Sequence, residues 1–476
     1  MNQKLWEASP DQKKKSLLSS YEQFISKRFK KNFNQKYENI LKWSIKNPGC
    51  FWSSIWDFSG IKGAKSKLKI TKSKIFYKNK FLPNSKLNFA ENLLSKNNND
   101  KAITFISENG FREERSWYEL NTNVSKIFKF LKSIKIKKKD RIAAYLPNSI
   151  ETVEAFISSS SLGAIWSSCS PDFGTQGILD RFTQINPKII FASDGYFYKG
   201  KSFDSLNKLK DLLNHLPSVR KVIITPFVRE NPDISSINNS LVWNDFIDPK
   251  PNPIIFEQVP FDHPLYIMYS SGTTGKPKSI VHGAGGTLIQ HLKELRLHTD
   301  ININDTVFYF TTCGWMMWNW LISVLASKAS IVLFDGFPMF KKQDLLLEIA
   351  EKEKISLFGV SAKYIDALNK AKIKSKYKLK ELRTICSTGS PLSKDGFEYI
   401  YKNLKKDVHL SSISGGTDIV SCFVLGIPTL PVKRGEIQGP GLGMAVEIWN
   451  DTGKVKRGRR GELVCTKPFP SRPVKF

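Results

Sequence analysis

The sequence predicts an α/β protein with two mostly parallel sheets covered by helices, followed by part of a small antiparallel barrel. Short apolar runs alternate with stretches of helical spacing between about residues 140 and 225, and the alternation returns between about residues 309 and 360. Repeated strand–helix–strand order with apolar strands is typical of a parallel sheet covered on both faces. Beyond about residue 420, prolines and glycines break up any helical pattern, so short antiparallel strands are expected there.

Each unit has its own expected elements. The first contains strands at 141–145, 164–168, 188–192 and 221–225, separated by helices. The second contains strands at 309–311, 329–334 and 356–360, with a helix near 343–353. The last contains a strand at 446–449, a turn at 450–453 and a strand at 461–465. The expected divisions of the 476 residues are an N-terminal extension (1–100), two α/β subdomains (101–260 and 261–420) and an incomplete β subdomain (421–476).

The formal net charge of +30 raises the question of a polyanionic partner. Nucleic acid or an anionic membrane would be one explanation, and a general bias toward lysine would be the other. The lysines are scattered over the whole length, and the densest run, residues 135–139, precedes an expected strand in the manner of a solvated loop. The scatter favours the bias, so no specific nucleic-acid partner and no membrane partner are expected.

Targeting and redox features point to a cytoplasmic protein. No apolar run is long enough to span a membrane, and the polar N-terminus lacks the apolar stretch of a secretory signal. The six cysteines show no CxxC spacing. Free thiols are therefore expected rather than a disulfide framework or a metal site.

The loop between the expected hairpin strands at 265–269 and 279–282 has the composition of a phosphate-binding loop. Its glycines allow close backbone approach, its hydroxyls donate hydrogen bonds and its lysines supply charge. The residues are Ser270, Ser271, Gly272, Thr273, Thr274, Gly275, Lys276, Pro277 and Lys278. The spacing is not that of a Walker loop, because only two residues separate the glycines and a proline follows the lysine. By composition alone, a polar hairpin loop without a function is an equally good interpretation.

Three further segments carry candidate site residues. Residues 387–392 include Gly389, Ser390 and Pro391, and taken alone an ordinary strand-to-helix turn is the better interpretation of them. Residues 414–418 read Ser-Gly-Gly-Thr-Asp, which is also compatible with a glycine turn followed by an Asp cap. Residues 311–320 are rich in aromatic side chains, and core packing is the simpler interpretation of Trp318 and Trp320.

The string Tyr-Ser-Ser-Gly-Thr-Thr-Gly-Lys-Pro-Lys at residues 269–278 resembles the core motif of the adenylate-forming acyl-CoA ligases. The resemblance covers about residue 85 to the end and implies the large N-terminal domain of that fold. It implies that residues 270–276 bind the β- and γ-phosphates of ATP, and that residues 389–391 contact adenine. It assigns Gly415, Gly416, Thr417 and Asp418 to ATP binding, with Thr417 on the α-phosphate and Asp418 on Mg²⁺, and it assigns Trp315 to the acyl pocket. The catalytic assignments are Thr273, Lys276 and Thr417.

Two departures from the usual pattern identify a branch of the family. Ser414 stands where most relatives place an aromatic residue, and Asp418 stands where they place Glu. The Gly-Gly-Thr-Asp form resembles the acetoacetate-activating branch, as do the strings at 87–94, 170–174 and 443–447. The resemblance implies ATP-dependent conversion of acetoacetate, through an acyl-adenylate, to acetoacetyl-CoA, with ATP, coenzyme A and Mg²⁺ taking part.

Other functions remain open at this point. A ligase for acetate or propionate differs only in its acyl pocket. A basic nucleic-acid-binding protein would need its lysines on one face. An inactive nucleotide-binding remnant would keep the motifs without the activity.

The family also has a ribose-binding Gly-Asp motif, a hinge and a C-terminal domain with a catalytic Lys, and none of them is found before Phe476. A truncated chain with little ligase activity of its own is therefore expected. The sequence does not specify an oligomeric state. His282, His291 and His298 follow the loop, and buried or exposed histidines are the simpler interpretation than a metal cluster.

Overall fold

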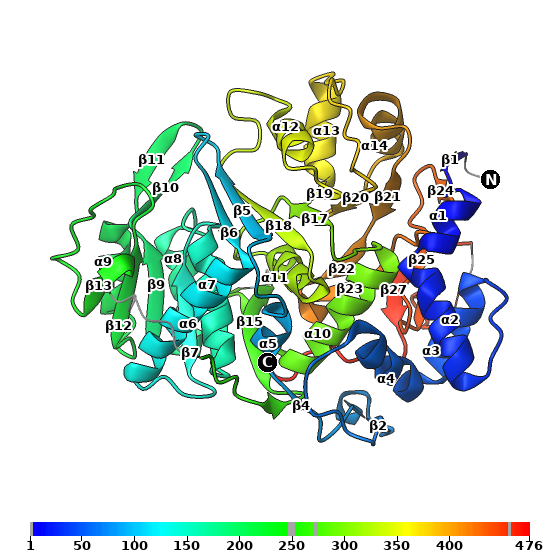
Figure 1. The fold of residues 1–476 in the computed structure, drawn as a ribbon, viewed down its shortest axis with the longest axis horizontal. Coiled ribbons are helices and arrows are strands. Elements are labelled where there is room, and N and C mark those ends of the chain that lie inside the picture. The colour runs from blue at the N-terminus through cyan, green and yellow to red at the C-terminus, as the bar shows by residue number, and fades with distance from the viewer. Residues whose placement is uncertain (1–2, 246–252, 271–274, 456–457) are drawn as a thin grey trace.

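A computed structural model describes residues 3–245, 253–270, 275–455 and 458–476 (Figure 1). Two seven-stranded sheets form the body, and a group of N-terminal helices lies beside short C-terminal strands on one side of it. No helix in the described part of the chain is long and apolar enough to cross a membrane. The mixed α/β class expected from the sequence is confirmed.

The first sheet has the strand order β13-β12-β9-β7-β8-β15-β16 and is parallel except at β16. Its central strands are continuous apolar runs, as strands covered on both faces require. The strands are β7 (Arg141–Tyr145), β8 (Ile165–Cys169), β9 (Ile189–Ser193), β12 (Lys221–Thr225), β13 (Ser240–Val242), β15 (Pro264–Ser270) and β16 (Lys278–Gly283). Its helices are α6 (Trp117–Ser133), α7 (Ile150–Ser161), α8 (Thr175–Ile185) and α9 (Leu206–Asn214).

The second sheet has the order β21-β20-β19-β17-β18-β5-β6 and is parallel except at β6. Its strands are β5 (Lys101–Ser107), β6 (Arg112–Ser116), β17 (Thr306–Tyr309), β18 (Ser330–Asp335), β19 (Leu357–Ser361), β20 (Thr384–Thr388) and β21 (His409–Ser412). The helices that follow these strands are α11 (Met316–Ile322), α12 (Leu345–Lys352), α13 (Ala362–Lys370) and α14 (Lys394–Tyr399).

The sheets are interleaved along the chain rather than divided at residue 260. The hairpin β5–β6 belongs to the second sheet although it precedes the first sheet in sequence, and the hairpin β15–β16 completes the first sheet. Local patterning fixes each strand, but pairing across the sheet is decided by tertiary packing, which a simple division of the sequence does not capture.

The first hundred residues form helices that pack onto the body. These are α1 (Pro10–Lys15), α2 (Leu17–Phe29), α3 (Tyr37–Lys46), α4 (Pro48–Ser59) and the short α5 (Phe89–Leu93). Tyr21 and Trp52 are fully buried in the main hydrophobic core. Strand β1 (Lys4–Trp6) pairs with β24 (Val432–Lys433), so this segment lies beside the C-terminal strands, as Figure 1 shows at the right.

The C-terminal part consists of short antiparallel strands, as the sequence predicts. Strands β22 (Ser414–Gly416), β23 (Ser421–Leu425) and β25 (Gly439–Pro440) form one sheet. Strands β26 (Val446–Trp449) and β27 (Glu462–Cys465) form a second antiparallel pair. All six cysteines are free thiols.

Helix α7 lies between the two sheets and contacts both β8 and β5. It is buried along almost its whole length, including the four consecutive serines at 158–161. Each of these serines donates its hydroxyl hydrogen to a carbonyl of its own helix. Small side chains that satisfy themselves in this way let both sheets approach the helix closely.

Asn148, in the turn after β7, joins the two sheets by hydrogen bonds. Its side-chain amide donates to the carbonyls of Thr311 and Phe334, at 3.2 Å each, and its Oδ1 accepts from the Trp318 indole at 3.0 Å. Its backbone N–H donates to the Asp335 carboxylate at 2.9 Å. The side chain is fully buried, so these bonds have no water to replace them.

Replacing Asn148 with Ala should lower the free energy of unfolding by about 3 kcal/mol, because the Trp318 indole and two carbonyls lose their partner. Urea unfolding followed by tryptophan fluorescence measures the change. The matched control is Asn214→Ala on the exposed end of α9, which should change stability little. Equal effects of the two substitutions would contradict the role of Asn148.

The Asp335 carboxyl makes the stability of the fold decrease as the pH rises. Burial raises the pKa of its carboxyl from 3.8 to about 7, and the Asn148 N–H opposes this rise only in part. The folded chain therefore holds a proton between pH 4 and 7 that the unfolded chain has released. The stability that this group contributes is present at low pH and is lost as the pH rises through about 7.

Asp335→Asn keeps an acceptor for the Asn148 N–H but does not titrate. Compared with this variant, the parent chain should lose about 1 kcal/mol of unfolding free energy between pH 5 and pH 8, because partial exposure of the side chain to solvent weakens the effect of burial. Urea unfolding of both chains at the two pH values measures the difference. A constant difference between them would show that Asp335 does not titrate in this range.

Candidate active site

A cavity of about 330 Å³ lies where the carboxyl ends of strands from both sheets meet. Residues at the ends of β8, β15 and β20 line it, together with the start of α11 and the β22 turn. Open parallel sheets bind ligands beyond the carboxyl ends of their strands. The lining residues are Ser168, Cys169, Phe173, Arg181, Tyr269, Gly314–Met317, Thr388, Gly389, Ile413, Gly415–Thr417 and Ser421.

The predicted phosphate loop connects β15 to β16, which pair in antiparallel register from Ser270 opposite Lys278. Tyr269, directly before the loop, lines the cavity. Gly275 and Lys276 are exposed. Of the predicted contact residues, Ser271, Gly272, Thr273 and Thr274 lie outside the described residues, so their roles stay predictions.

Helix α8 contacts the end of this loop and the start of β16. The Gln184 side chain donates to the Pro277 carbonyl at 2.9 Å and accepts from the Ser279 hydroxyl at 2.7 Å. These bonds fix the base of β16 against a helix that also lines the cavity through Arg181. Sequence reasoning missed Gln184, because nothing in its local pattern reveals a partner so distant in the chain.

The predicted adenine segment follows β20. Gly389 adopts a positive φ of 86°, a conformation that glycine reaches without steric cost, and turns the chain at the cavity wall. The Thr388 hydroxyl donates to the Ile413 carbonyl at 3.0 Å and ties this turn to the next segment. Ser390 and Pro391 are exposed just beyond. Their assignment to adenine is untested by this geometry.

Gly415, Gly416 and Thr417 line the same cavity from the other side. A Cβ on Gly415 would lie 2.1 Å from the Ser421 carbonyl oxygen, so the close approach of β23 requires glycine there. Asp418 follows Thr417 and is exposed. The β22 turn and the phosphate-loop hairpin therefore face one cavity, which is the arrangement that a shared nucleotide needs.

The aromatic string at 311–320 divides into two parts. Trp318 and Trp320 are buried, as the core-packing interpretation predicts. Trp315 is 50% exposed and lines the cavity with Met316 and Met317. An indole at this wall limits the length of any group that enters.

Arg181 is a cavity residue that the sequence did not single out. Its guanidinium lies 4.7 Å from the ring centroid of Phe173 and 5.5 Å from that of Tyr269. The Tyr269 hydroxyl in turn donates to the Arg181 carbonyl at 3.1 Å. Stacking on two rings orients a positive charge at the cavity wall. Only the fold brings the three side chains together.

The three histidines after the loop bind backbone rather than metal. His282, His291 and His298 are fully buried, and a ring nitrogen of each lies within hydrogen-bonding distance of a carbonyl oxygen between Thr417 and Gly426. Burial lowers the pKa of His282 to about 4, so its ring is neutral. The described residues contain no group of His, Cys, Asp and Glu side chains that could hold a metal ion.

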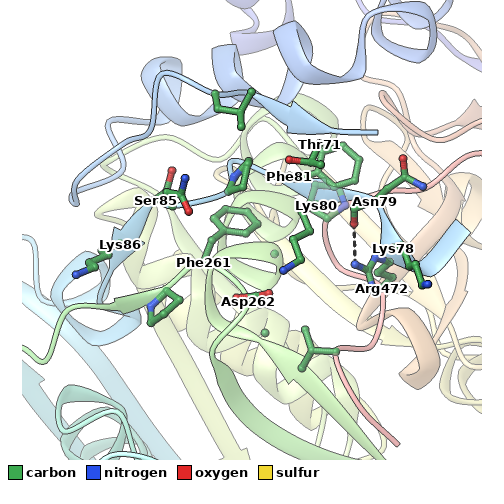
Figure 2. A pocket seen from close by; sticks show the side chains of 18 residues that line it. Thr71, Lys78, Asn79, Lys80, Phe81, Ser85, Lys86, Phe261, Asp262 and Arg472 are labelled. Carbon is green, nitrogen blue, oxygen red and sulfur yellow. Dashed lines mark hydrogen bonds between the residues drawn. The ribbon is translucent and has the colours of Figure 1, made fainter. Parts of the chain in front are cut away.

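A larger cavity, of about 600 Å³, lies at the opposite end of the β15–β16 hairpin. Lys78, Lys80, Lys86 and Arg472 line it, and Arg472 donates to the Asn79 carbonyl at 2.7 Å (Figure 2). It contains none of the residues that the sequence predicts for the site. Cavity size alone therefore does not identify the candidate site.

Residues 91–472 match the family described as AMP-binding enzyme. The chain is 45% identical over 476 residues to the acetoacetyl-coenzyme A synthetase of Rhizobium meliloti (strain 1021), covering 99% of this chain and 73% of the relative. It is 46% identical over 453 residues to the acetoacetyl-CoA synthetase of Gallus gallus, covering 92% of this chain and 68% of that protein.

Two further proteins extend this comparison. The solved acetoacetyl-CoA synthetase from Streptomyces lividans superposes with a TM-score of 0.93 at 34% identity, covering 100% of this chain and 74% of that one. A malonamoyl-CoA synthetase from Penicillium aethiopicum is 36% identical over 493 residues, covering 97% of this chain and 68% of the relative. The residues around the cavity are thus set in a fold that these proteins share.

Proposed function

Because the chain belongs to the family of AMP-binding enzymes, we propose that it activates acetoacetate with ATP and transfers the acyl group to coenzyme A. The observation that supports this most directly is the single cavity shared by Tyr269, Trp315 and Thr417. It brings together the hairpin expected to hold polyphosphate, the wall expected to hold the acyl group and the turn expected to hold the α-phosphate.

The reaction proceeds in two displacements. A carboxylate oxygen of the acid attacks the α-phosphorus of ATP, and the bond to pyrophosphate breaks. The coenzyme A thiol, losing its proton, then attacks the carbonyl carbon of the acyl-adenylate, and AMP leaves. A carboxylate is a poor acyl donor because its oxygen leaves badly, and the adenylate supplies a phosphate leaving group instead.

The residues of this chain contribute alignment and charge. We assign the Thr417 hydroxyl to an α-phosphate oxygen, and Lys276 and the other loop residues to the β- and γ-phosphates. Holding the carboxylate in line with the phosphorus turns a collision of two molecules into a reaction within one complex. Neutralising charge on the phosphate oxygens stabilises the transition state further.

Asp418 fits the proposed Mg²⁺ site. Its carboxylate is exposed beside Thr417, and none of the ion pairs found among the described residues involves it. A carboxylate oxygen is the ligand type that Mg²⁺ binds beside nucleotide phosphates. The ion, when bound, neutralises phosphate charge.

The acyl specificity follows from the cavity wall and from two relatives. Acetoacetate and malonamate, the acids named by those relatives, both carry a carbonyl two carbons from the carboxylate. The Trp315 indole limits the chain length beyond it. The alternative is a ligase for acetate or propionate. Its acyl pocket would not favour an acid that has a β-carbonyl over an acid that lacks one.

Calorimetric titration with non-hydrolysable acyl sulfamoyl-adenosines tests the proposal on the purified chain, because it measures binding without requiring turnover. The acetoacetyl compound should bind at least tenfold more tightly than the acetyl and propionyl compounds, since only it offers the β-carbonyl. Equal affinities would favour the alternative ligase. No binding of any of these compounds would refute the proposed function.

The double substitution Thr417→Ala with Asp418→Ala should weaken AMP binding at least tenfold in the presence of Mg²⁺, because it removes a charge-assisted phosphate contact. The matched control is Asp451→Ala with Thr452→Ala, an adjacent Asp–Thr pair in the exposed β26–β27 turn. Both variants are measured by the same titration. Unchanged affinity in the Thr417 variant would remove that turn from the site.

Trp315→Ala should allow longer acyl groups to bind in the cavity. The side chain is half exposed, so the substitution carries little risk for the fold. Affinity for the hexanoyl sulfamoyl-adenosine should rise at least fivefold relative to the acetoacetyl compound. The same relative preference in parent and variant would show that another wall sets the length.

A further inference from the structure

Two buried histidines contact the backbone of the turn that contains Thr417. His282 lies on β16 opposite Tyr266 in the hairpin register, and its Nε2 is 2.8 Å from the Thr417 carbonyl oxygen. A carbonyl only accepts hydrogen bonds, so Nε2 carries the proton and donates it. The other ring nitrogen, Nδ1, has no hydrogen-bond partner among the described residues. The bond to Thr417 is therefore the one polar contact found for this buried ring.

The same turn is fixed at a second point. The His291 Nε2, on α10 (Ala284–Lys293), lies 2.7 Å from the Val420 carbonyl oxygen, and its Nδ1 lies 2.8 Å from the Ser323 hydroxyl. Glu294 and Gln290 both hydrogen-bond the hydroxyl of Ser421, which lines the cavity. Side chains from one continuous segment thus contact the turn at three successive places.

The backbone of this turn is strained. Val420 adopts a φ of 46° in the left-handed region, although its side chain is β-branched and fully buried. Such a conformation costs on the order of 1–3 kcal/mol and persists only where surrounding contacts hold it. The Val420 N–H also closes a short turn onto the Thr417 carbonyl at 3.2 Å, so His282 supplies the second bond to that oxygen.

We propose that His282 is a positioning residue that sets the distance between the Thr417–Asp418 turn and the phosphate-loop hairpin. The residue lies on the strand that closes the loop, four positions after Lys278, and its ring reaches the backbone of the opposite cavity wall. Movement of either wall is thereby coupled to the other. The inference rests on the proposed function, because it requires that both walls contact one nucleotide.

The two ring nitrogens allow a test that separates positioning from folding. His282→Gln places an amide N–H close to the position of Nε2, whereas His282→Asn places it close to Nδ1 and cannot reach the Thr417 carbonyl. The Gln variant should bind AMP within about threefold of the parent chain. The Asn variant should bind AMP about tenfold more weakly, the loss expected when one hydrogen bond is removed.

Adenosine provides the readout that a merely structural defect would not give. It lacks the phosphate that Thr417 is assigned to bind, so its affinity should be nearly the same in the parent chain and both variants. The ratio of adenosine to AMP dissociation constants should therefore fall about tenfold in the Asn variant only. Equal losses for both ligands, or equal behaviour of the Gln and Asn variants, would overturn the inference.

His298→Gln is the matched control. His298 is as deeply buried as His282, and its Nδ1 donates to the Gly426 carbonyl at 2.9 Å. Unlike Thr417, neither His298 nor Gly426 lines the cavity. This substitution should lower the melting temperature without changing the adenosine-to-AMP ratio. If the parent chain binds no AMP, the proposed function fails. If it binds AMP and the Asn variant binds it equally well, only the role of His282 fails.

Discussion

The hydrogen bonds of Asn148 are the constraint on which the relative placement of the two sheets depends. One buried side chain contacts the segment that follows β17, the end of β18 and the indole of Trp318, while its backbone belongs to the turn after β7. The cavity has walls from β8 and β15 of the first sheet and from β20 of the second sheet together with β22. A site composed of both sheets exists only while their edges stay in this relation.

Side chains from distant segments support the turn and the hairpin beside the cavity, and glycines, serines and threonines form part of its wall. The histidines and Glu294 lie beneath the β22 turn, Gln184 supports the loop hairpin, and Arg181 is stacked between two rings. Glycines at 389 and 415 let the backbone turn or approach closely where a side chain would not fit. This combination suits phosphate chemistry, in which alignment and charge do most of the work.

Patterning within short windows predicted much of this fold. The run at 188–192 is a buried central strand, and the hairpin around the loop was recognisable from two apolar runs separated by glycines and hydroxyls. The cavity residues Trp315 and Thr417 were found because their motifs are contiguous in sequence. The place of β5 in the second sheet, the stacking of Arg181 and the partners of the histidines depend on contacts between distant segments, and no local pattern encodes them.

The interleaved order of the sheets has a consequence for synthesis on the ribosome. Strand β5 pairs with β18, from Ile103 opposite Ile331 to Ser107 opposite Asp335, and the entire first sheet is encoded between them. At translation rates of about 5–20 residues per second, the nascent β5–β6 hairpin waits on the order of 10–50 s for its neighbour. During that interval its apolar edge is open to wrong partners, so this region is where a chaperone would have most to protect.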